Sequence, residues 1–103
     1  MNTIDLAHYQ GFDWDKGNQD KNWNKHGVSY TECEQIFFNE PLVLSDDLKH
    51  SDLESRFYAF GQTDEKRKLY IVFTVRKNLI RIISARDMDK KERKYYENIE
   101  VHS

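Results

Sequence analysis

The 103-residue sequence predicts a single α+β domain: an antiparallel β-sheet of about four to five strands, two N-terminal helices and one C-terminal helix. Two apolar runs, residues 69–75 and 79–85, flank a short polar turn, as in a β-hairpin. Ser29 and Glu32 have the spacing of a helix capping box before an apolar stripe. The same spacing recurs near the C-terminus, before a charged helix.

The N-terminal part predicts an edge strand and two helices of different character. Residues 11–14 are rich in aromatic side chains and suit an edge strand. Residues 16–25 lack proline and carry mostly long or amide side chains, which predicts a polar helix capped by Asp15 and closed by Gly27. The second helix begins after Ser29 and stops before the single proline. Its apolar stripe consists of Tyr30, Cys33, Ile36 and Phe37.

The rest of the chain supplies the sheet and the last helix, in the order β-α-α-β-β-β-β-α. Residues 42–44 are a short strand candidate, followed by an acidic loop over residues 45–52. In the hairpin turn, Asn78 suits a positive φ. The strand predicted over residues 56–63 places on one face Arg56, Tyr58 and Phe60. The final helix is expected to bury along one side Met88, one of Tyr95 and Tyr96, and Ile99.

The composition favours a cytoplasmic protein with one core. The chain is 38% hydrophobic and 33% charged, with mean hydropathy −0.90, and no apolar run approaches a membrane span. The N-terminus shows neither part of a signal peptide, and residues 1–10 are expected to be an arm before a domain over residues 11–103. Cys33, the single cysteine, excludes an internal disulfide and fits a reducing compartment. Its place on an apolar stripe indicates a small core residue.

Charge is unevenly distributed along the chain. Residues 1–65 carry five basic and thirteen acidic side chains, a net −8, whereas residues 66–103 carry eleven basic and five acidic ones, a net +6. This asymmetry fits a basic face that holds an anionic polymer. It fits equally well a solvated surface on which the two signs compensate in the folded protein.

Motifs for metal, nucleotide or serine-hydrolase chemistry are absent from the sequence. The four histidines show no metal-ligand spacing, and the single cysteine has no partner for a metal site. The acidic cluster over residues 46–52 could bind a cation, but a flexible acidic loop is the favoured interpretation. There is no phosphate-binding glycine loop and no nucleophile elbow.

The remaining candidates for chemistry are basic side chains. Four arginines come from adjacent predicted strands, and guanidinium groups bind phosphate and stabilise phosphoryl transition states: Arg56, Arg76, Arg81 and Arg86. Lys25 and His26 end the polar helix, where His26 could act as general acid or base near neutral pH. Cations at a helix C-terminus are also favoured by the dipole alone.

Parity within the hairpin limits which arginines can cooperate. Arg81 and Arg86 are five residues apart, so on a regular strand they point to opposite faces. Both serve one site only if a bulge intervenes or Arg86 lies beyond the strand end. Pairing with a carboxylate across the sheet is a competing structural role for Arg81.

The sequence resembles the BrnT family, the toxins of type II toxin–antitoxin pairs, over about residues 11–97. The residues that carry the resemblance are Trp14-Asp15, Asn22, Lys25-His26-Gly27-Val28-Ser29-Tyr30, Glu54-Ser55-Arg56-Phe57, Arg81-Ile82-Ile83-Ser84-Ala85-Arg86 and Glu92-Arg93-Lys94-Tyr95-Tyr96. Two positions depart from the usual pattern, with Tyr30 in place of phenylalanine and Cys33 in place of a small residue. Both are packing changes that leave the site residues intact.

The resemblance implies a RelE-like fold, a compact antiparallel sheet with flanking helices. It implies metal-free RNA cleavage without a cofactor, growth arrest, and neutralisation by a BrnA-type antitoxin with a ribbon-helix-helix DNA-binding part, through which alone operator DNA is bound. It carries over as polar site positions Lys25, His26, Arg56, Arg81 and Arg86.

Two functional hypotheses follow. The first is an endoribonuclease toxin in which Arg56 and Arg86 clamp the phosphate, Arg81 supports them, and His26 or Lys25 transfers protons. One of Tyr95 and Tyr96 could stack a base. The second is a non-catalytic module whose basic face binds an acidic protein or nucleic acid.

Overall fold

Eight elements follow one another in the structure, a computed structural model that describes residues 11–14, 16–46 and 55–102. They are β1 (Gly11–Phe12), α1 (Lys16–His26), α2 (Tyr30–Ile36), β2 (Val43–Asp46), β3 (Phe57–Gln62), β4 (Lys68–Arg76), β5 (Leu79–Asp87) and α3 (Lys90–His102). This order confirms the predicted α+β fold. The expected arm, the Asp15 cap and residues 47–52 of the acidic loop lie outside the described residues.

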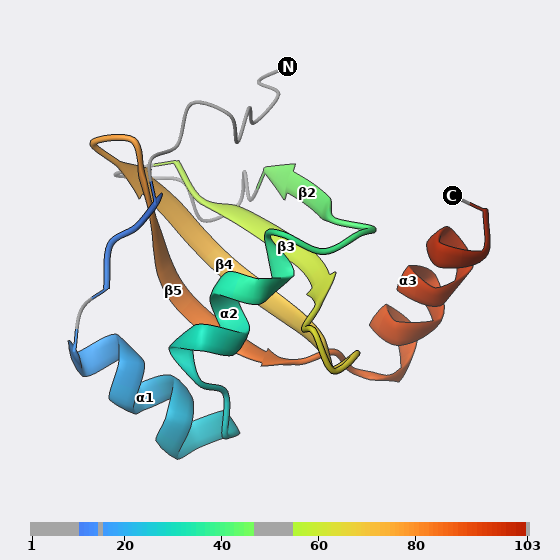
Figure 1. The fold of residues 1–103 in the computed structure, drawn as a ribbon, viewed down its shortest axis with the longest axis horizontal. Helices are drawn as coiled ribbons and strands as arrows, with labels where there is room; N and C mark the ends of the chain where they lie inside the picture. Colours follow the sequence, from blue (N-terminus) through green and yellow to red (C-terminus); the bar gives the residue numbers. More distant parts are fainter. Residues whose placement is uncertain (1–10, 15, 47–54, 103) are drawn as a thin grey trace.

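The five strands form one sheet in the order β1-β5-β4-β3-β2. The neighbours from β5 to β2 are antiparallel, as predicted, whereas β1 pairs in parallel with the start of β5 through Gly11 and Leu79. Figure 1 shows α2 lying across the sheet, α1 beside β5, and α3 beyond the end of β3. The predicted strand at residues 42–44 is shifted to Val43–Asp46, so Ser45 belongs to the strand and not to the loop.

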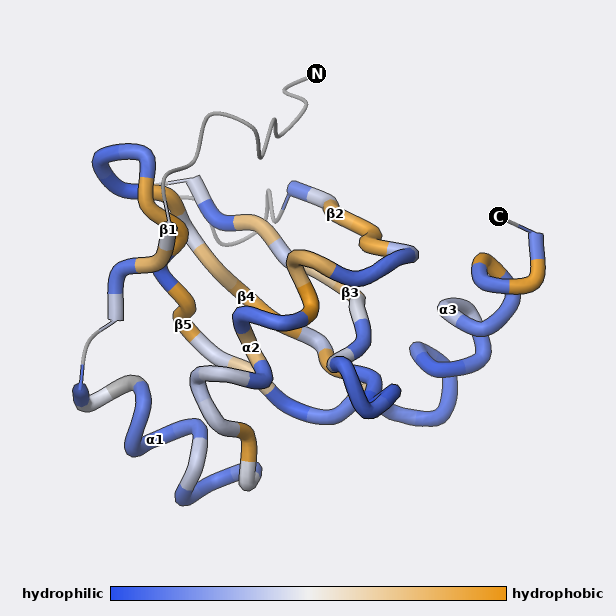
Figure 2. Tube along the Cα trace, in the orientation of Figure 1, coloured by the Kyte–Doolittle hydropathy of each residue, from blue (hydrophilic) through white to orange (hydrophobic). Residues whose placement is uncertain are grey.

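The hydrophobic core lies between α2 and one face of the sheet, which we call the inner face. The tube in Figure 2 is apolar along much of β4 and β5 and polar along most of α1. The fully or almost fully buried core side chains are Val28, Cys33, Ile36, Phe37, Ala59, Leu69, Ile71, Phe73, Ile80, Ile82 and Ala85. Burial raises the pKa of the Cys33 thiol to about 12, which confirms its role as a small core residue.

The capping box predicted for α2 is present. The Glu32 N–H donates to Ser29 Oγ at 3.2 Å, and the Ser29 N–H donates to Glu32 Oε1 at 3.1 Å. Cys33 is buried, as the stripe predicted, but Tyr30 is 49% exposed. Tyr30 lies in the first turn of α2, where it contacts the ring of Trp14 at 5.9 Å and not the core.

Helix α1 is polar, as predicted, and Gly27 closes it with φ +63°, the left-handed conformation that favours glycine. One polar residue attaches the helix to the sheet. Asn22 is 2% exposed, and its Oδ1 accepts the N–H of Ala85 in β5 at 3.2 Å. No helix among the described residues is both long and apolar enough to cross a membrane.

The turn of the β4–β5 hairpin contains two residues with positive φ, Lys77 at 52° and Asn78 at 65°. The prediction for Asn78 is confirmed. Positive φ at both central residues is the requirement of a type I′ turn, whose twist matches that of the two strands. The local conformation therefore fixes the start of the hairpin register.

Helix α3 begins with the second box, in which Asp89 and Glu92 exchange backbone and side-chain hydrogen bonds at 2.8 Å each. The two neighbouring tyrosines of this helix differ in burial. Tyr96 is fully buried and donates its hydroxyl to the carbonyl of Pro41, whereas Tyr95 is 53% exposed. Tyr96 is thus the core residue, and only Tyr95 remains available for a ligand.

Gly61 brings β3 and α2 into direct contact, and replacing it by alanine is expected to destabilise the fold. A Cβ at Gly61 would lie 2.9 Å from Ile36 Cβ and 3.2 Å from the Ile36 carbonyl oxygen. Because one of these atoms belongs to the backbone, α2 must shift, at a cost of about 1–3 kcal/mol. Urea unfolding measures this loss. Gly17→Ala, at an exposed position of α1, serves as the control and should be neutral or stabilising; equal stability of both variants would contradict the expectation.

Candidate functional site

Arg86 stands at the C-terminal end of β5 and is fixed by the start of α3. Its Nη1 and Nη2 donate to Glu92 Oε1 and Oε2 at 2.7 and 3.0 Å, a bidentate pair. Nη1 also donates to the Asp87 carbonyl at 3.1 Å, and the guanidinium carbon lies 4.2 Å from the centre of the Tyr70 ring. The side chain is nevertheless 37% exposed. Arg86 is therefore an oriented cation that a ligand can reach from solvent.

The charge of Arg86 is secure. Hydrogen bonding to Glu92 raises the pKa of the guanidinium further, and its attraction to the same carboxylate acts in the same direction. Glu92 is held in turn by the capping box of α3. The first turn of α3 thus orients the Arg86 guanidinium in the structure as it stands, with no loop movement required.

A β-bulge places Arg81 and Arg86 on the same face of the sheet. Between β4 and β5, Val72 pairs with Ser84 and the next residue, Phe73, pairs with Ile82, so Ile83 is the extra residue. The extra residue reverses the alternation that would otherwise send the two arginines to opposite sides. They share the face opposite α2, which we call the outer face.

Arg81 and Arg56 lie at the far end of the outer face from Arg86. Arg81 pairs across the strands with Thr74, and its Nη1 lies 3.3 Å from Asp13 Oδ2. Continuing the β3–β4 register by one residue places Arg56 beside the same Thr74, whose hydroxyl donates to the Ser55 carbonyl at 2.7 Å. At about 3.3 Å per residue, Arg81 is roughly 15 Å from Arg86 along β5. With Arg81 held toward Asp13 and Arg86 toward Glu92, the two ends of the face do not converge on one phosphate.

Lys25 and His26 reach the same end of the sheet as Arg86, from α1. Lys25 is exposed and His26 is half-buried at the last position of the helix. The His26 carbonyl accepts Arg67 Nη2 at 3.2 Å, and Arg67 in turn binds the carboxylate of Asp87, which follows Arg86 in the chain. Asp87 and Arg86 are neighbours in β5 and point to opposite faces, so this network lies on the inner side of the sheet end, whereas the Arg86 guanidinium lies on the outer side.

Arg67, absent from the predicted site residues, is the centre of this network. Its Nε and Nη2 donate to the Asp87 carboxylate at 2.7 and 2.9 Å, and its Nη1 donates to Glu32 Oε2 at 3.1 Å and to the Gly27 carbonyl at 2.9 Å. The Asp87 partner is the main reason that the pKa of Arg67 is raised, and Arg67 lowers the pKa of Asp87. One guanidinium thus ties α1, the α2 cap and the end of β5 together.

The sequence signal for Arg67 was weak. It stands in a run of three basic residues after an exposed turn in which Lys66 has φ +72°. Its side-chain partners lie 20 and 35 residues away in the chain. Only the spatial arrangement distinguishes it from its neighbours.

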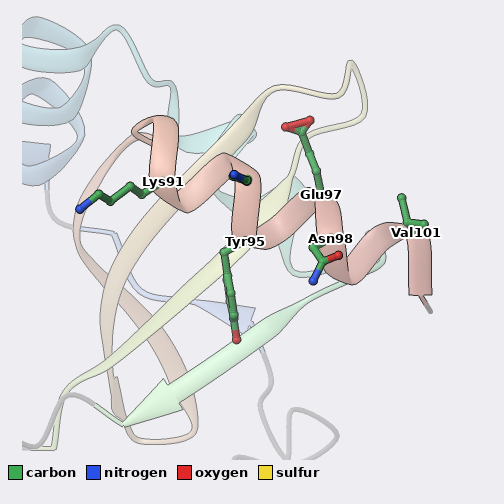
Figure 3. A pocket seen from close by; sticks show the side chains of 6 residues that line it. Lys91, Tyr95, Glu97, Asn98 and Val101 are labelled. Carbon is green, nitrogen blue, oxygen red and sulfur yellow. The ribbon is translucent and has the colours of Figure 1, made fainter.

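A hollow of about 670 Å³ lies along α3. Figure 3 shows Tyr95 extending from the helix across the sheet, and the hollow is lined by Lys91, Lys94, Tyr95, Glu97, Asn98 and Val101. None of the predicted site residues lines it. The end of β5, with Arg86, is the candidate site because charge, orientation and partners converge there.

Over residues 11–14, 16–46 and 55–102, no three histidine, cysteine or acidic side chains lie together as a metal site would require. Most of the acidic cluster considered above, residues 47–52, lies outside those ranges.

Comparison with known proteins adds the identity that geometry alone does not give. The family model described as ribonuclease toxin, BrnT, of type II toxin–antitoxin system matches residues 14–92. The search of curated proteins found no match. The matched range runs from Trp14 to Glu92 and so includes the five predicted site residues and the partner of Arg86. The chain belongs to the BrnT family of ribonuclease toxins of type II toxin–antitoxin systems.

Proposed function

We propose that this chain is an endoribonuclease toxin that cleaves RNA without a metal ion and thereby arrests growth. Membership of a ribonuclease toxin family supports the reaction class. The observation that carries the proposal furthest is Arg86, a permanently charged, exposed guanidinium held by Glu92 and Tyr70. Such a group can supply the positive charge that a phosphoryl transition state needs.

The proposed reaction is internal transesterification. The 2′-oxygen of a ribose attacks the adjacent phosphorus, the bond to the 5′-oxygen of the next nucleotide breaks, and a cyclic phosphate forms. The proton of the 2′-hydroxyl passes to a base, and the departing 5′-oxygen takes up a proton to become a free hydroxyl. DNA lacks the attacking group and is not cut.

We assign a role to each of the five residues on the basis of its position. Arg86 binds the scissile phosphate, and Lys25 with His26 provides proton transfer from the end of α1. Arg56 and Arg81, roughly 15 Å away by the strand rise, bind the RNA backbone at a different nucleotide. This division modifies the simpler hypothesis in which Arg56 and Arg86 clamp one phosphate.

The partner of a type II toxin is an antitoxin protein. We propose a BrnA-type antitoxin whose ribbon-helix-helix part binds the operator, in a hetero-oligomer that assembles in the cytoplasm. An outer face with arginines at both ends would bind cellular RNA unless it were covered. An antitoxin that covers these arginines would neutralise the toxin.

RNA cleavage in the presence of EDTA tests the proposal. The purified chain is expected to cut single-stranded RNA at an undiminished rate in excess chelator, because its own cations replace a metal. Cleavage that disappears with EDTA and returns with a divalent ion would overturn the metal-free reaction. Salt-dependent RNA binding with no cleavage under any condition would instead support a non-catalytic binding module.

A further inference from the structure

The outer face carries a continuous row of aromatic side chains beside Arg86. Tyr58 and Tyr70 lie stacked with ring centres 5.8 Å apart, and Phe60 contacts both at 5.8 and 5.5 Å. Tyr95 of α3 extends the row, with its ring 6.0 Å from Phe60. Three elements, β3, β4 and α3, thus contribute to one aromatic surface, which we call the aromatic row.

The aromatic row does not belong to the core described above. Along β3 and β4 these rings alternate with inner-face residues such as Ala59 and Ile71, which are fully buried under α2. Tyr58, Phe60 and Tyr70 are half-buried, so part of each ring faces away from the protein. Cross-strand aromatic pairs do stabilise sheets. Four rings in contact on a partly exposed face, however, provide more aromatic surface than strand pairing needs.

Charge distinguishes among the partners that such a surface could bind. The Arg86 guanidinium lies over the Tyr70 ring at 4.2 Å, at one end of the aromatic row. Arg81 lies on the same face toward the other end, where it pairs with Thr74, two residues along β4 from Val72, the partner of Tyr58. Rings flanked by guanidinium groups match single-stranded nucleic acid, whose bases stack on aromatic side chains while its phosphates pair with cations.

We propose that Tyr58 and Tyr70 stack bases of the RNA strand whose phosphate Arg86 holds. The inference rests on the proposed function and adds to it the position of the bases. The roughly 15 Å between Arg86 and Arg81 leaves room for more than one nucleotide along β5. Bases would thus be held at the aromatic row, next to the reacting phosphate, whatever their identity, because every base has a ring face that can stack.

The test uses a single-stranded RNA that carries one 2-aminopurine as a fluorescent base. Its 2′-hydroxyl groups are replaced by 2′-O-methyl groups, so the protein cannot cleave it. Wild-type protein is expected to quench 2-aminopurine at one or two positions beside the bound phosphate. Tyr58→Leu and Tyr70→Leu should weaken binding roughly tenfold each and abolish the quenching, because one stacked base loses its partner. Tyr70→Phe keeps the ring and should bind within about twofold of wild type.

Phe38→Leu is the matched control, since Phe38 is 78% exposed at the end of α2 and contacts Phe12. It should leave RNA binding unchanged. Circular dichroism and urea unfolding establish that each variant is folded, and if the leucine variants do not fold, quenching by the wild-type protein decides alone. Unquenched 2-aminopurine at every position overturns the inference.

Three further outcomes separate this inference from the proposed function. If wild type cuts RNA while folded Tyr58→Leu and Tyr70→Leu bind it normally, the aromatic row is not a base platform, and only this inference fails. If those variants lose the antitoxin and keep RNA, the row belongs to the protein partner, and the inference fails again. If wild type neither binds nor cuts RNA, both the proposed function and this inference fail.

Discussion

Arg86→Ala is expected to abolish growth arrest and to slow RNA cleavage by roughly 100-fold or more. The substitution removes the cation that is held by Glu92 at 2.7 and 3.0 Å and packed on Tyr70. Because the negative charge on the phosphate rises toward the transition state, loss of the Arg86 guanidinium should affect kcat more than KM. Induced expression measures growth arrest, and single-turnover cleavage of a short RNA measures the rate.

Two variants serve as controls for Arg86→Ala. Lys90→Ala removes one exposed positive charge at the start of α3 and should retain full activity. Arg86→Lys keeps the charge but loses the bidentate geometry, so it should recover only part of the rate. If Arg86→Ala folds normally and remains fully toxic, Arg86 has no part in the mechanism.

Arg67→Ala is expected to lower the free energy of unfolding by about 2–4 kcal/mol, although Arg67 is not proposed to touch RNA. The change leaves Glu32 and Asp87 without their partner and frees the carbonyls at the end of α1. For a domain of this size the melting temperature should fall by roughly 10–25 °C. Urea and thermal unfolding measure the loss. Arg67→Lys cannot reach all of these partners, so its stability should lie between that of wild type and that of Arg67→Ala.

The pH dependence of this effect has a definite sign. Arg67 holds the pKa of Asp87 below its ordinary 3.8, so the pair stabilises the native state above that pH. As pH falls through the lowered native pKa, Asp87 becomes protonated and this contribution is lost. The difference in stability between wild type and Arg67→Ala should therefore be largest near neutral pH and shrink below about pH 4. A difference that stays constant from pH 7 to pH 3 would contradict the role given to the pair.

The fold was largely predictable because its signals are local. The capping box at Ser29 and Glu32, the glycine that closes α1 and the turn at Asn78 each depend on residues a few positions apart. Local chemistry of this kind determines backbone conformation directly. The choice between Tyr95 and Tyr96 was not local, since the Pro41 carbonyl that Tyr96 binds lies 55 residues away.

The sequence indicated candidate site residues but not how they are arranged in space. The extra residue Ile83, which brings Arg81 and Arg86 to one face, results from the packing of β5 against β4 and has no marker in the sequence. Arg67 was missed for a related reason, because distant parts of the chain meet only in the fold. The catalytic roles of Lys25, His26, Arg56, Arg81 and Arg86 remain predictions for mutagenesis to test.

One measurement tests the proposed chemistry most directly: cleavage, in excess EDTA, of an RNA oligonucleotide and of the same oligonucleotide with a single 2′-deoxy nucleotide on the 5′ side of the cut. The all-ribose strand should yield a cyclic phosphate end and a free 5′-hydroxyl, and the substituted strand should resist cutting at that position alone. Equal cleavage of both strands, or a product with a 5′-phosphate, would show that the 2′-hydroxyl is not the nucleophile and would contradict the mechanism.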